Sequence, residues 1–266
     1  MPLNTIVIMT NIQLQIQNKV AIIHLDRSEK YNSFIGEMAL SLQKVLDDLA
    51  NDDQIRCIVI TGSGKAFCAG QDLQEATDPE GPALSKIVSE HYNPIILRIR
   101  TMAKPVIAAV NGVAAGAGAN IALACDIVVA AESASFIQAF SKIGLIPDSG
   151  GTWTLPRLIG RQRASALMML GEKVNATDAM NMGMVYKIYP DERFHEEWLK
   201  MAELLSNMPT YGLALTKEAL NLTDQHTLQE QLAVEDRLQT LAGKSQDYRE
   251  GTAAFLEKRQ PIFKGK

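Results

Sequence analysis

Cysteine and histidine are scarce in this sequence, and the few that occur form no recognisable pattern. The three cysteines, Cys57, Cys68 and Cys125, have no paired spacing, so the sequence does not indicate a disulfide framework and we expect reduced thiols in a core. The four histidines form no metal-ligand signature. The sequence therefore predicts no metal site and no redox cofactor.

An excess of basic residues and long apolar runs are also missing. The formal net charge is -4 and the pI is about 5.6, which does not supply the broad basic surface that nucleic acids or anionic membranes need. No apolar run reaches the roughly 20 residues that cross a bilayer. We expect a cytoplasmic protein that binds neither nucleic acid nor membrane.

The short apolar leader that ends at Met9 lacks the charged region and the cleavage site of a secretory signal. It precedes the first patterned strand, so Met9 is a candidate alternative start. In that case residues 1–8 are expected to form an unstructured extension.

What is present is the composition of a globular protein, with 266 residues of which 47% are hydrophobic and 21% charged. Residues 14–17 alternate and residues 20–25 are apolar, which predicts a hairpin. Helical spacing over 37–50 and an apolar strand over 56–61 then begin a β-α-β rhythm. The rhythm continues with a helical stretch at 83–102, a strand at 106–110, a helix from 116 and a strand at 127–130. Such alternation favours an α/β fold.

After residue 161 the strand pattern fades except near 185–188, and amphipathic helices are expected at 193–208, 210–222, 228–242 and 246–258. We therefore divide the chain into a core of residues 9–205 and a C-terminal helical region of residues 206–266. The helical region is expected to cap the core or to pack against another subunit.

Three glycine-rich segments contain the candidate chemistry, and each follows an expected strand or precedes an expected helix. They read TGSGKAFCAGQDL at 61–73, AVNGVAAGAG at 109–118 and GLIPDSGGT at 144–152. Small residues at a helix start leave backbone N–H groups open to a ligand. The first segment lacks the spacing of a P-loop, which argues against nucleotide hydrolysis.

Asp148 is the one acid in the third segment, whose other residues are small or apolar. Taken alone, an aspartate before a helix is more often an N-cap than a catalyst. The other two segments shift the interpretation towards proton transfer.

Together the three segments resemble the motifs of the crotonase, or enoyl-CoA hydratase/isomerase, superfamily, and the resemblance covers nearly the whole chain. It implies a ββα spiral core followed by helices that build trimers, commonly paired into hexamers. The implied substrate is an acyl-CoA, with CoA as part of the substrate and no separate cofactor. Two backbone N–H groups, which map onto Ala69 and Ala117, are expected to form an oxyanion hole for the thioester oxygen.

The departures from the superfamily pattern are informative. Hydratases of the superfamily use two glutamates, and the matching positions hold Asn120 and Phe140, neither of which is a carboxylate base. Asp148 occupies a position where some isomerases and dehalogenases carry an acid. Residues 140–148, 247–251 and 255–259 resemble the isomerases of phenylacetate catabolism that convert ring-1,2-epoxyphenylacetyl-CoA to its oxepin form.

Other residues are expected to bind the substrate. Arg27 and Lys30 are placed at the nucleotide end of CoA, and Phe263 and Lys266 near the adenine of an adjacent subunit, although solvated basic residues are an equal alternative. The remaining predicted contacts are Phe67, Gln71, Asp72, Leu73, Gly116, Asn120 and Phe140. Residues 74–94, with His91 and Tyr92, form either a lid over the acyl group or a surface loop.

Three alternatives to an aromatic acyl-CoA isomerase stay open at this point. The first is a general Δ3,Δ2-enoyl-CoA isomerase, which needs the same site. The second is thioester hydrolysis, with Asp148 activating water. The third is a crotonase-like RNA-binding or scaffold protein, against which the acidic balance of the chain argues.

Overall fold

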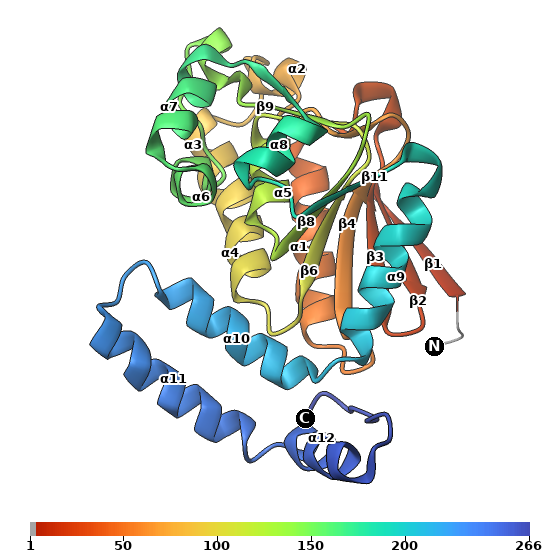
Figure 1. Cartoon of the computed structure of the whole chain (residues 1–266). Coiled ribbons are helices and arrows are strands. Elements are labelled where there is room, and N and C mark those ends of the chain that lie inside the picture. Colours follow the sequence, from red (N-terminus) through yellow and green to blue (C-terminus); the bar gives the residue numbers. More distant parts are fainter. Residues whose placement is uncertain (1–3) are drawn as a thin grey trace.

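The larger of two β-sheets forms the centre of the molecule (Figure 1). The computed structural model describes residues 4–266. This sheet has seven strands in the order β1-β2-β3-β4-β6-β8-β11, in which β1, β2 and β3 pair antiparallel and the others parallel. The strands are β1 (Asn4–Met9), β2 (Ile12–Gln17), β3 (Val20–Leu25), β4 (Cys57–Gly62), β6 (Val106–Val110), β8 (Ile127–Ala131) and β11 (Lys187–Tyr189).

A second sheet of four short strands has the order β10-β9-β7-β5. The strands are β5 (Ala66–Cys68), β7 (Val113–Ala115), β9 (Ser135–Ile137) and β10 (Lys173–Asn175). Strands β5, β7 and β9 each follow a strand of the larger sheet within a few residues and lead towards a helix. This repeated strand, strand, helix order confirms the ββα spiral that the resemblance implied.

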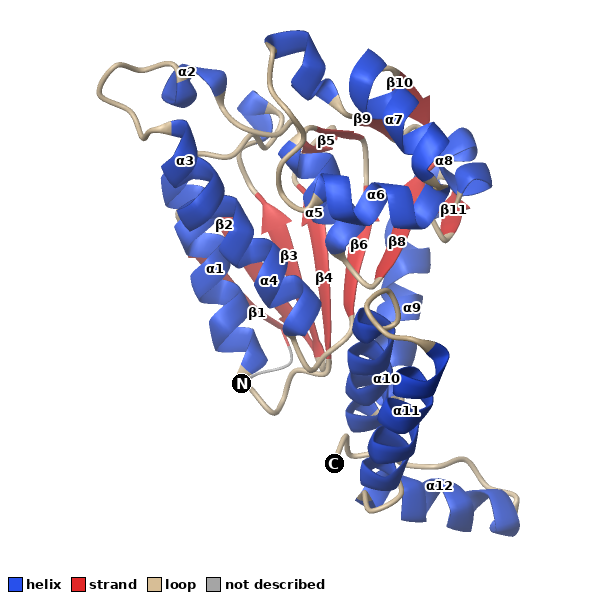
Figure 2. Cartoon of the chain, turned by 90° about the vertical axis from the view of Figure 1, so that its left-hand side faces the viewer, coloured by secondary structure: helices blue, strands red, loops and turns tan. Residues whose placement is uncertain are grey.

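Helices cover both faces of the larger sheet. In Figure 2, α1 and α4 lie on one face, and α9 packs against β3, β4 and β8 on the other. Strands β4 and β6 are buried at every position, which explains their continuous apolar sequence. The helices of the core are α1 (Gly36–Ala50), α2 (Leu73–Ala76), α3 (Leu84–Lys86), α4 (Asn93–Thr101), α5 (Ala117–Ala124), α6 (Gly151–Ile159), α7 (Arg161–Leu170), α8 (Ala176–Met182) and α9 (Phe194–Asn207). Short 3-10 or π turns are η1 (Ser28–Lys30), η2 (Ile87–Tyr92), η3 (Ala139–Ile143) and η4 (Asp191–Arg193).

Three further helices, α10 (Thr210–Leu222), α11 (Leu228–Ala242) and α12 (Gln246–Glu257), extend from one end of the core (Figures 1 and 2). The helix bounds expected for the C-terminal region are confirmed to within two residues. The proposed division between residues 205 and 206 falls in the last turn of α9 and stays a prediction.

The expectation of an unstructured N-terminal extension is wrong for residues 4–8. These residues belong to β1, which pairs antiparallel with β2 from Asn4 opposite Gln17 to Met9 opposite Ile12. Residues 1–3 lie outside the described residues. The alternating sequence of β2 was enough to predict a strand. That β1 pairs with it on the side away from β3 is seen only in the structure.

A buried lysine attaches α10 to the core. The Lys217 ammonium donates to the Ile99 carbonyl at 2.6 Å and to Asp126 Oδ2 at 2.7 Å, and Asp126 Oδ2 also accepts the Val106 N–H at 2.8 Å. Burial lowers the pKa of Lys217 and raises the pKa of Asp126. Each charge therefore depends on its partner to offset the loss of water.

We expect Lys217→Met to lower the free energy of unfolding by about 3 kcal/mol, because methionine fills the space but leaves the Asp126 carboxylate buried without its ion pair. Urea denaturation of both proteins measures the difference. Lys200, whose side chain is 57% exposed in its ion pair with Glu196, provides the control, and Lys200→Met should change stability little. Equal effects of the two substitutions would contradict the assignment.

Candidate active site

A backbone amide is left unpaired in the first glycine-rich segment, at Gln71. The Phe34 N–H donates to the Gly70 carbonyl at 2.7 Å, and the Asp72 N–H donates to the Phe34 carbonyl at 2.8 Å. Peptide groups alternate sides along an extended chain, so the Gln71 N–H faces away from Phe34. Within residues 4–266 the structure gives this amide no acceptor.

The prediction that Ala69 supplies an oxyanion donor is wrong. Its N–H donates to the Tyr31 carbonyl at 2.9 Å, so it is not available to a substrate. The unpaired amide of Gln71, two residues later, is the candidate donor in this segment.

The second candidate donor, Ala117, is the first residue of α5, where helical amides have no intrahelical acceptor. Its nitrogen lies 3.5 Å from the position that a Cβ on Gly70 would occupy. Gly70 has φ +92°, and such a Cβ would also lie 3.0 Å from the Ala115 carbonyl oxygen. Glycine at this position thus lets the two candidate amides approach each other.

Asp148 lies in a tight loop between η3 and α6. It is half-buried, and its Oδ1 accepts a hydrogen bond from the Ser149 hydroxyl at 2.8 Å. Ser149 has φ +51° although it is not glycine, a conformation that persists only where the surroundings impose it. The N-cap of α6 is Gly150, with no side-chain cap, so the alternative of Asp148 as N-cap is wrong.

Burial raises the pKa of Asp148, and the hydrogen bond from Ser149 partly opposes this effect. A carboxylate with a raised pKa is a stronger base and comes closer to the pH at which proton transfer in both directions is efficient.

We expect Ser149→Gly to move the acidic limb of the kcat profile to higher pH. Glycine accepts the positive φ but removes the hydrogen bond that stabilises the ionised Asp148, so its pKa rises further and the base form appears later. A pH profile measures this shift. Thr152→Ala, at an exposed position of α6, is the control that should leave the limb in place. An unchanged limb in Ser149→Gly would contradict this account.

Asn120 is wholly buried and holds the Asp148 loop. Its Nδ2 donates to the Asp148 carbonyl at 2.9 Å, and its Oδ1 accepts from Gln138 Nε2 at 2.8 Å. A Cβ on Gly151 would lie 2.3 Å from Asn120 Nδ2, so the loop packs directly on this amide. Asn120 lies within one turn of Ala117 on α5, so its side chain ties the Asp148 loop to the helix that carries this donor.

Phe140 is also buried, with its ring 3.8 Å from the Cβ position of Gly116. At the two positions that carry glutamates in hydratases of the superfamily, this chain therefore has Asn120, whose amide holds the Asp148 loop, and Phe140, whose ring lies beside the start of α5.

Some predicted CoA contacts are used within the chain instead. Arg27 donates to Asp72 Oδ2 at 3.0 Å and to the Ser33 carbonyl at 2.6 Å, and the Arg27 and Asp72 side chains are only 12% and 8% exposed. Both terminal nitrogens are thus already hydrogen-bonded within the chain, and a contact between Arg27 and the CoA phosphates stays a prediction. Lys30 stays exposed and donates to Gln74 Oε1 at 3.1 Å.

Phe67 is 0% exposed in the core, so its side chain is not open to a substrate, contrary to the expectation of a contact. Leu73 is 51% exposed. At the C-terminus the Phe263 carbonyl accepts from Arg56 at 2.8 Å, and Lys266 is exposed. The Asp247 carboxylate accepts the N–H groups of residues 264 and 265 at 2.6 and 2.7 Å, which fastens this tail to α12.

Glu75 is a residue that the sequence interpretation missed. Its Oε2 accepts from Gln71 Nε2 at 2.8 Å, and its Oε1 accepts the Gly36 N–H at 2.9 Å. The signal was the spacing of four residues from Gln71 across a helix start. Its significance needed the position of α1, which no local pattern gives.

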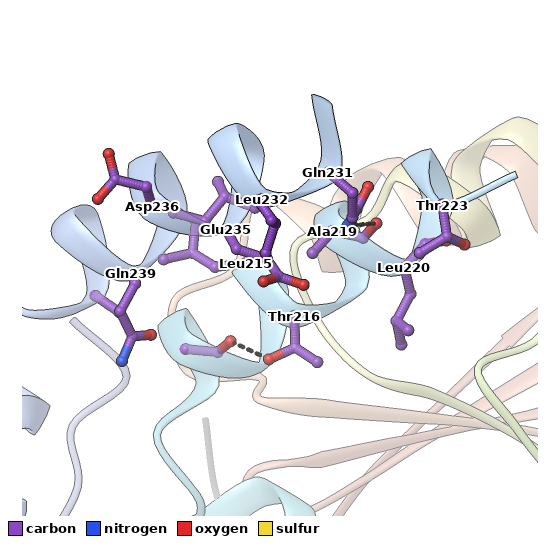
Figure 3. A pocket seen from close by; sticks show the side chains of 13 residues that line it. Leu215, Thr216, Ala219, Leu220, Thr223, Gln231, Leu232, Glu235, Asp236 and Gln239 are labelled. Carbon is purple, nitrogen blue, oxygen red and sulfur yellow. Dashed lines mark hydrogen bonds between the residues drawn. The ribbon is translucent and has the colours of Figure 1, made fainter. Parts of the chain in front are cut away.

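A groove between α10 and α11 lies apart from these residues (Figure 3). Its volume is about 610 Å³, and its walls include Leu215, Leu220 and Leu232 as well as Glu235 and Asp236. None of the predicted site residues lines it.

Across residues 4–266 no group of three or more histidine, cysteine, aspartate or glutamate residues could hold a metal ion. None of the described helices is long and apolar enough to cross a membrane.

Comparison with known proteins gives a consistent picture. The family model for enoyl-CoA hydratase/isomerase matches residues 15–266. The chain is 49% identical over 254 residues to a 1,2-epoxyphenylacetyl-CoA isomerase of Escherichia coli strain K12, covering 94% of this chain and 97% of that protein. It is 45% identical to a probable enoyl-CoA hydratase of Rhodobacter capsulatus, covering 96% and 98%. The crystal structure of an enoyl-CoA hydratase from Bacillus anthracis superposes with a TM-score of 0.90 at 34% identity, covering 97% of this chain and 100% of that one.

Proposed function

The chain belongs to the enoyl-CoA hydratase/isomerase family of enzymes that act on CoA thioesters, and within that family we propose that it is an isomerase with Asp148 as its single acid and base. The observation that carries this proposal is the pair of buried residues Asn120 and Phe140. Neither is a carboxylate, so the two positions that carry glutamates in hydratases of the superfamily supply no acid or base, and we assign proton transfer to Asp148.

In the proposed reaction the thioester oxygen accepts hydrogen bonds from the N–H groups of Gln71 and Ala117. Asp148 removes a proton from one carbon of the acyl group, and the electron pair of the broken C–H bond moves into an enolate whose charge rests on that oxygen. The same carboxyl group returns the proton to another carbon as the double bond shifts. The reaction consumes no water, so one titratable group is enough.

For the substrate we propose ring-1,2-epoxyphenylacetyl-CoA, converted to its oxepin form, with Δ3,Δ2-enoyl-CoA isomerisation as a further activity of the same site. The 49% identity to an Escherichia coli protein described as 1,2-epoxyphenylacetyl-CoA isomerase supports the aromatic substrate. The relative described as a probable hydratase, at 45% identity, makes hydration the competing function.

Purified protein assayed with enzymatically generated epoxyphenylacetyl-CoA, 3-hexenoyl-CoA and crotonyl-CoA tests the proposal. We expect turnover of the first two and hydration of crotonyl-CoA that is slower by at least about 100-fold, the size of one general acid–base contribution. Crotonyl-CoA hydration as the fastest reaction would overturn it.

We also propose that the chain forms a homotrimer or homohexamer through its C-terminal helices. Phe255 and Leu256 are 83% and 80% exposed and line one groove together with Phe263, and exposed apolar side chains that lie together mark an interface. In the assembly we place exposed Lys30 near the CoA phosphates, and Phe263 with Lys266 near the adenine of an adjacent subunit.

We expect Leu256→Glu to shift the protein towards smaller species in sedimentation velocity, because a carboxylate would lose its water on association. Leu97 on α4, which is 63% exposed, lies outside the C-terminal helices, and Leu97→Glu should leave the sedimentation coefficient unchanged. A monomeric starting protein, or an unaltered Leu256→Glu profile, would contradict this interface.

A further inference from the structure

Tyr92 is 1% exposed, and its hydroxyl donates to Gln71 Oε1 at 2.8 Å. We propose that Tyr92 is a positioning residue. By holding the side-chain amide of Gln71, it orients the backbone N–H of the same residue towards the thioester oxygen. This inference rests on the proposed function, in which the Gln71 N–H is one of two oxyanion donors.

Phe34 links Tyr92 and Gln71 a second time. Its peptide groups bond Gly70 and Asp72, on either side of Gln71, while its ring meets the Tyr92 ring edge to face at a centroid distance of 5.8 Å. Phe34, Tyr92 and Gln71 therefore each contact the other two: Phe34 bonds the backbone on either side of Gln71, Phe34 and Tyr92 pack ring against ring, and the Tyr92 hydroxyl bonds the Gln71 side chain. Rotation of the Gln71 peptide group would break the bonds to Phe34 or displace the side chain from Tyr92.

Glu75 holds the amide nitrogen of the Gln71 side chain, as Tyr92 holds its amide oxygen. Gln71 Nε2 donates to Glu75 Oε2 at 2.8 Å, and the same carboxylate accepts the first N–H of α1 from Gly36. A glutamine side chain loses considerable rotamer freedom when both polar atoms of its amide are hydrogen-bonded. Gln71 is therefore fixed before the substrate binds, and such preorganisation is what a donor to a developing negative charge requires.

The π-helical turn η2 presents Tyr92 to this network. Pro94, two residues further on, has no N–H for the Glu90 carbonyl four residues before it. Gln43 Nε2, from α1, donates to that carbonyl at 2.7 Å and to the His91 carbonyl at 3.1 Å. The wider turn lets the consecutive residues His91 and Tyr92 both be buried, and π turns of this kind often occur at functional sites.

Tyr92 is suited to act as a permanent donor. Burial raises its pKa well above the ordinary value, and the negative charges of Asp148 and Glu75 raise it further. The hydroxyl therefore keeps its proton across the working pH range, and the side-chain oxygen of Gln71 always faces a donor rather than a phenolate.

Tyr92→Phe removes only the hydroxyl and keeps the ring that packs on Phe34. We expect kcat to fall about 10- to 100-fold with KM within threefold, because a loosened donor weakens stabilisation of the transition state more than binding of the substrate. Tyr189, a buried tyrosine of β11, is the matched control, and Tyr189→Phe should leave both constants unchanged.

A second measurement separates this inference from the role of Asp148. In the Asp148→Asn background, binding of 2,4-hexadienoyl-CoA is followed by its ultraviolet absorbance, whose red shift reports polarisation of the thioester carbonyl without turnover. We expect adding Tyr92→Phe to halve the shift or abolish it, with the dissociation constant within threefold. A full shift in the double variant would overturn the inference, whereas an active Asp148→Asn enzyme would overturn only the proposed base.

Gln71→Glu gives a pH signature that a merely structural contact would not. When ionised, the new carboxylate cannot donate to Glu75 and is repelled by it, but when protonated it replaces the amide on both sides. In the Asp148→Asn background we expect the red shift to recover as the pH falls. The matched Gln71→Met variant has no proton to gain and should show no recovery; the same pH response in both would also overturn the inference.

Discussion

Replacing Asp148 with asparagine is expected to lower the isomerase kcat by about 1,000-fold, within the range that general acid–base catalysis contributes. Asparagine keeps the size of the side chain and can still bond Ser149, but it cannot accept and return a proton. The loss should fall on kcat and not on KM, because the candidate oxyanion donors and the acyl contacts are unchanged. Steady-state assays with 3-hexenoyl-CoA and epoxyphenylacetyl-CoA measure both constants.

The thermal stability of the same variant provides the control for misfolding. Burial raises the folded-state pKa of Asp148 above its unfolded value, so the stability associated with this group is present at low pH and is lost as the pH rises through the folded pKa. Asp148→Asn carries no charge to bury, so it should melt at a higher temperature than the parent near neutral pH and lose this advantage in acid. Asp48→Asn, at an exposed position, is the matched control for the loss of one carboxylate. Activity within a few-fold of the parent would exclude Asp148 as the base.

The sequence was sufficient for those helices and strands whose signals are local. The apolar run of β4, the spacing of α1 and the glycine-rich turns each depend on neighbouring residues, and each was found within a residue or two. The approach of the Gly70 and Ala117 segments followed from the resemblance and not from these patterns, since the two positions are distant in sequence.

The choice of donor could not be predicted because it depends on non-local hydrogen bonds. Ala69 and Gln71 lie in the same short motif, but the amide of Ala69 meets Tyr31, whereas the bridge to Phe34 turns the amide of Gln71 outward. The same applies to Arg27, which looked like a free cation until its partner Asp72 was seen 3.0 Å away. Sequence identifies which groups can do chemistry, and tertiary pairing decides which of them remain available.

The largest main-chain effect is expected from Ala117→Pro. Proline has no N–H, and it is tolerated at the first position of a helix, where its fixed φ suits the helical backbone. Ala117 occupies that position in α5, so the substitution deletes one proposed oxyanion donor without removing an intrahelical hydrogen bond. We expect kcat to fall by about 100- to 1,000-fold, equivalent to about 3–4 kcal/mol of transition-state stabilisation.

Leu228 is the first residue of α11 and is 76% exposed, so Leu228→Pro makes the same chemical change away from the site. It should retain the parent's kcat, and circular dichroism and urea midpoints of both variants establish that the helices persist. A folded Ala117→Pro protein with the parent's kcat would mean that the thioester oxygen does not rest on this amide. A folded, inactive protein whose red shift with 2,4-hexadienoyl-CoA is also lost would locate the defect at the oxyanion site, because proton transfer by Asp148 does not contribute to that optical signal.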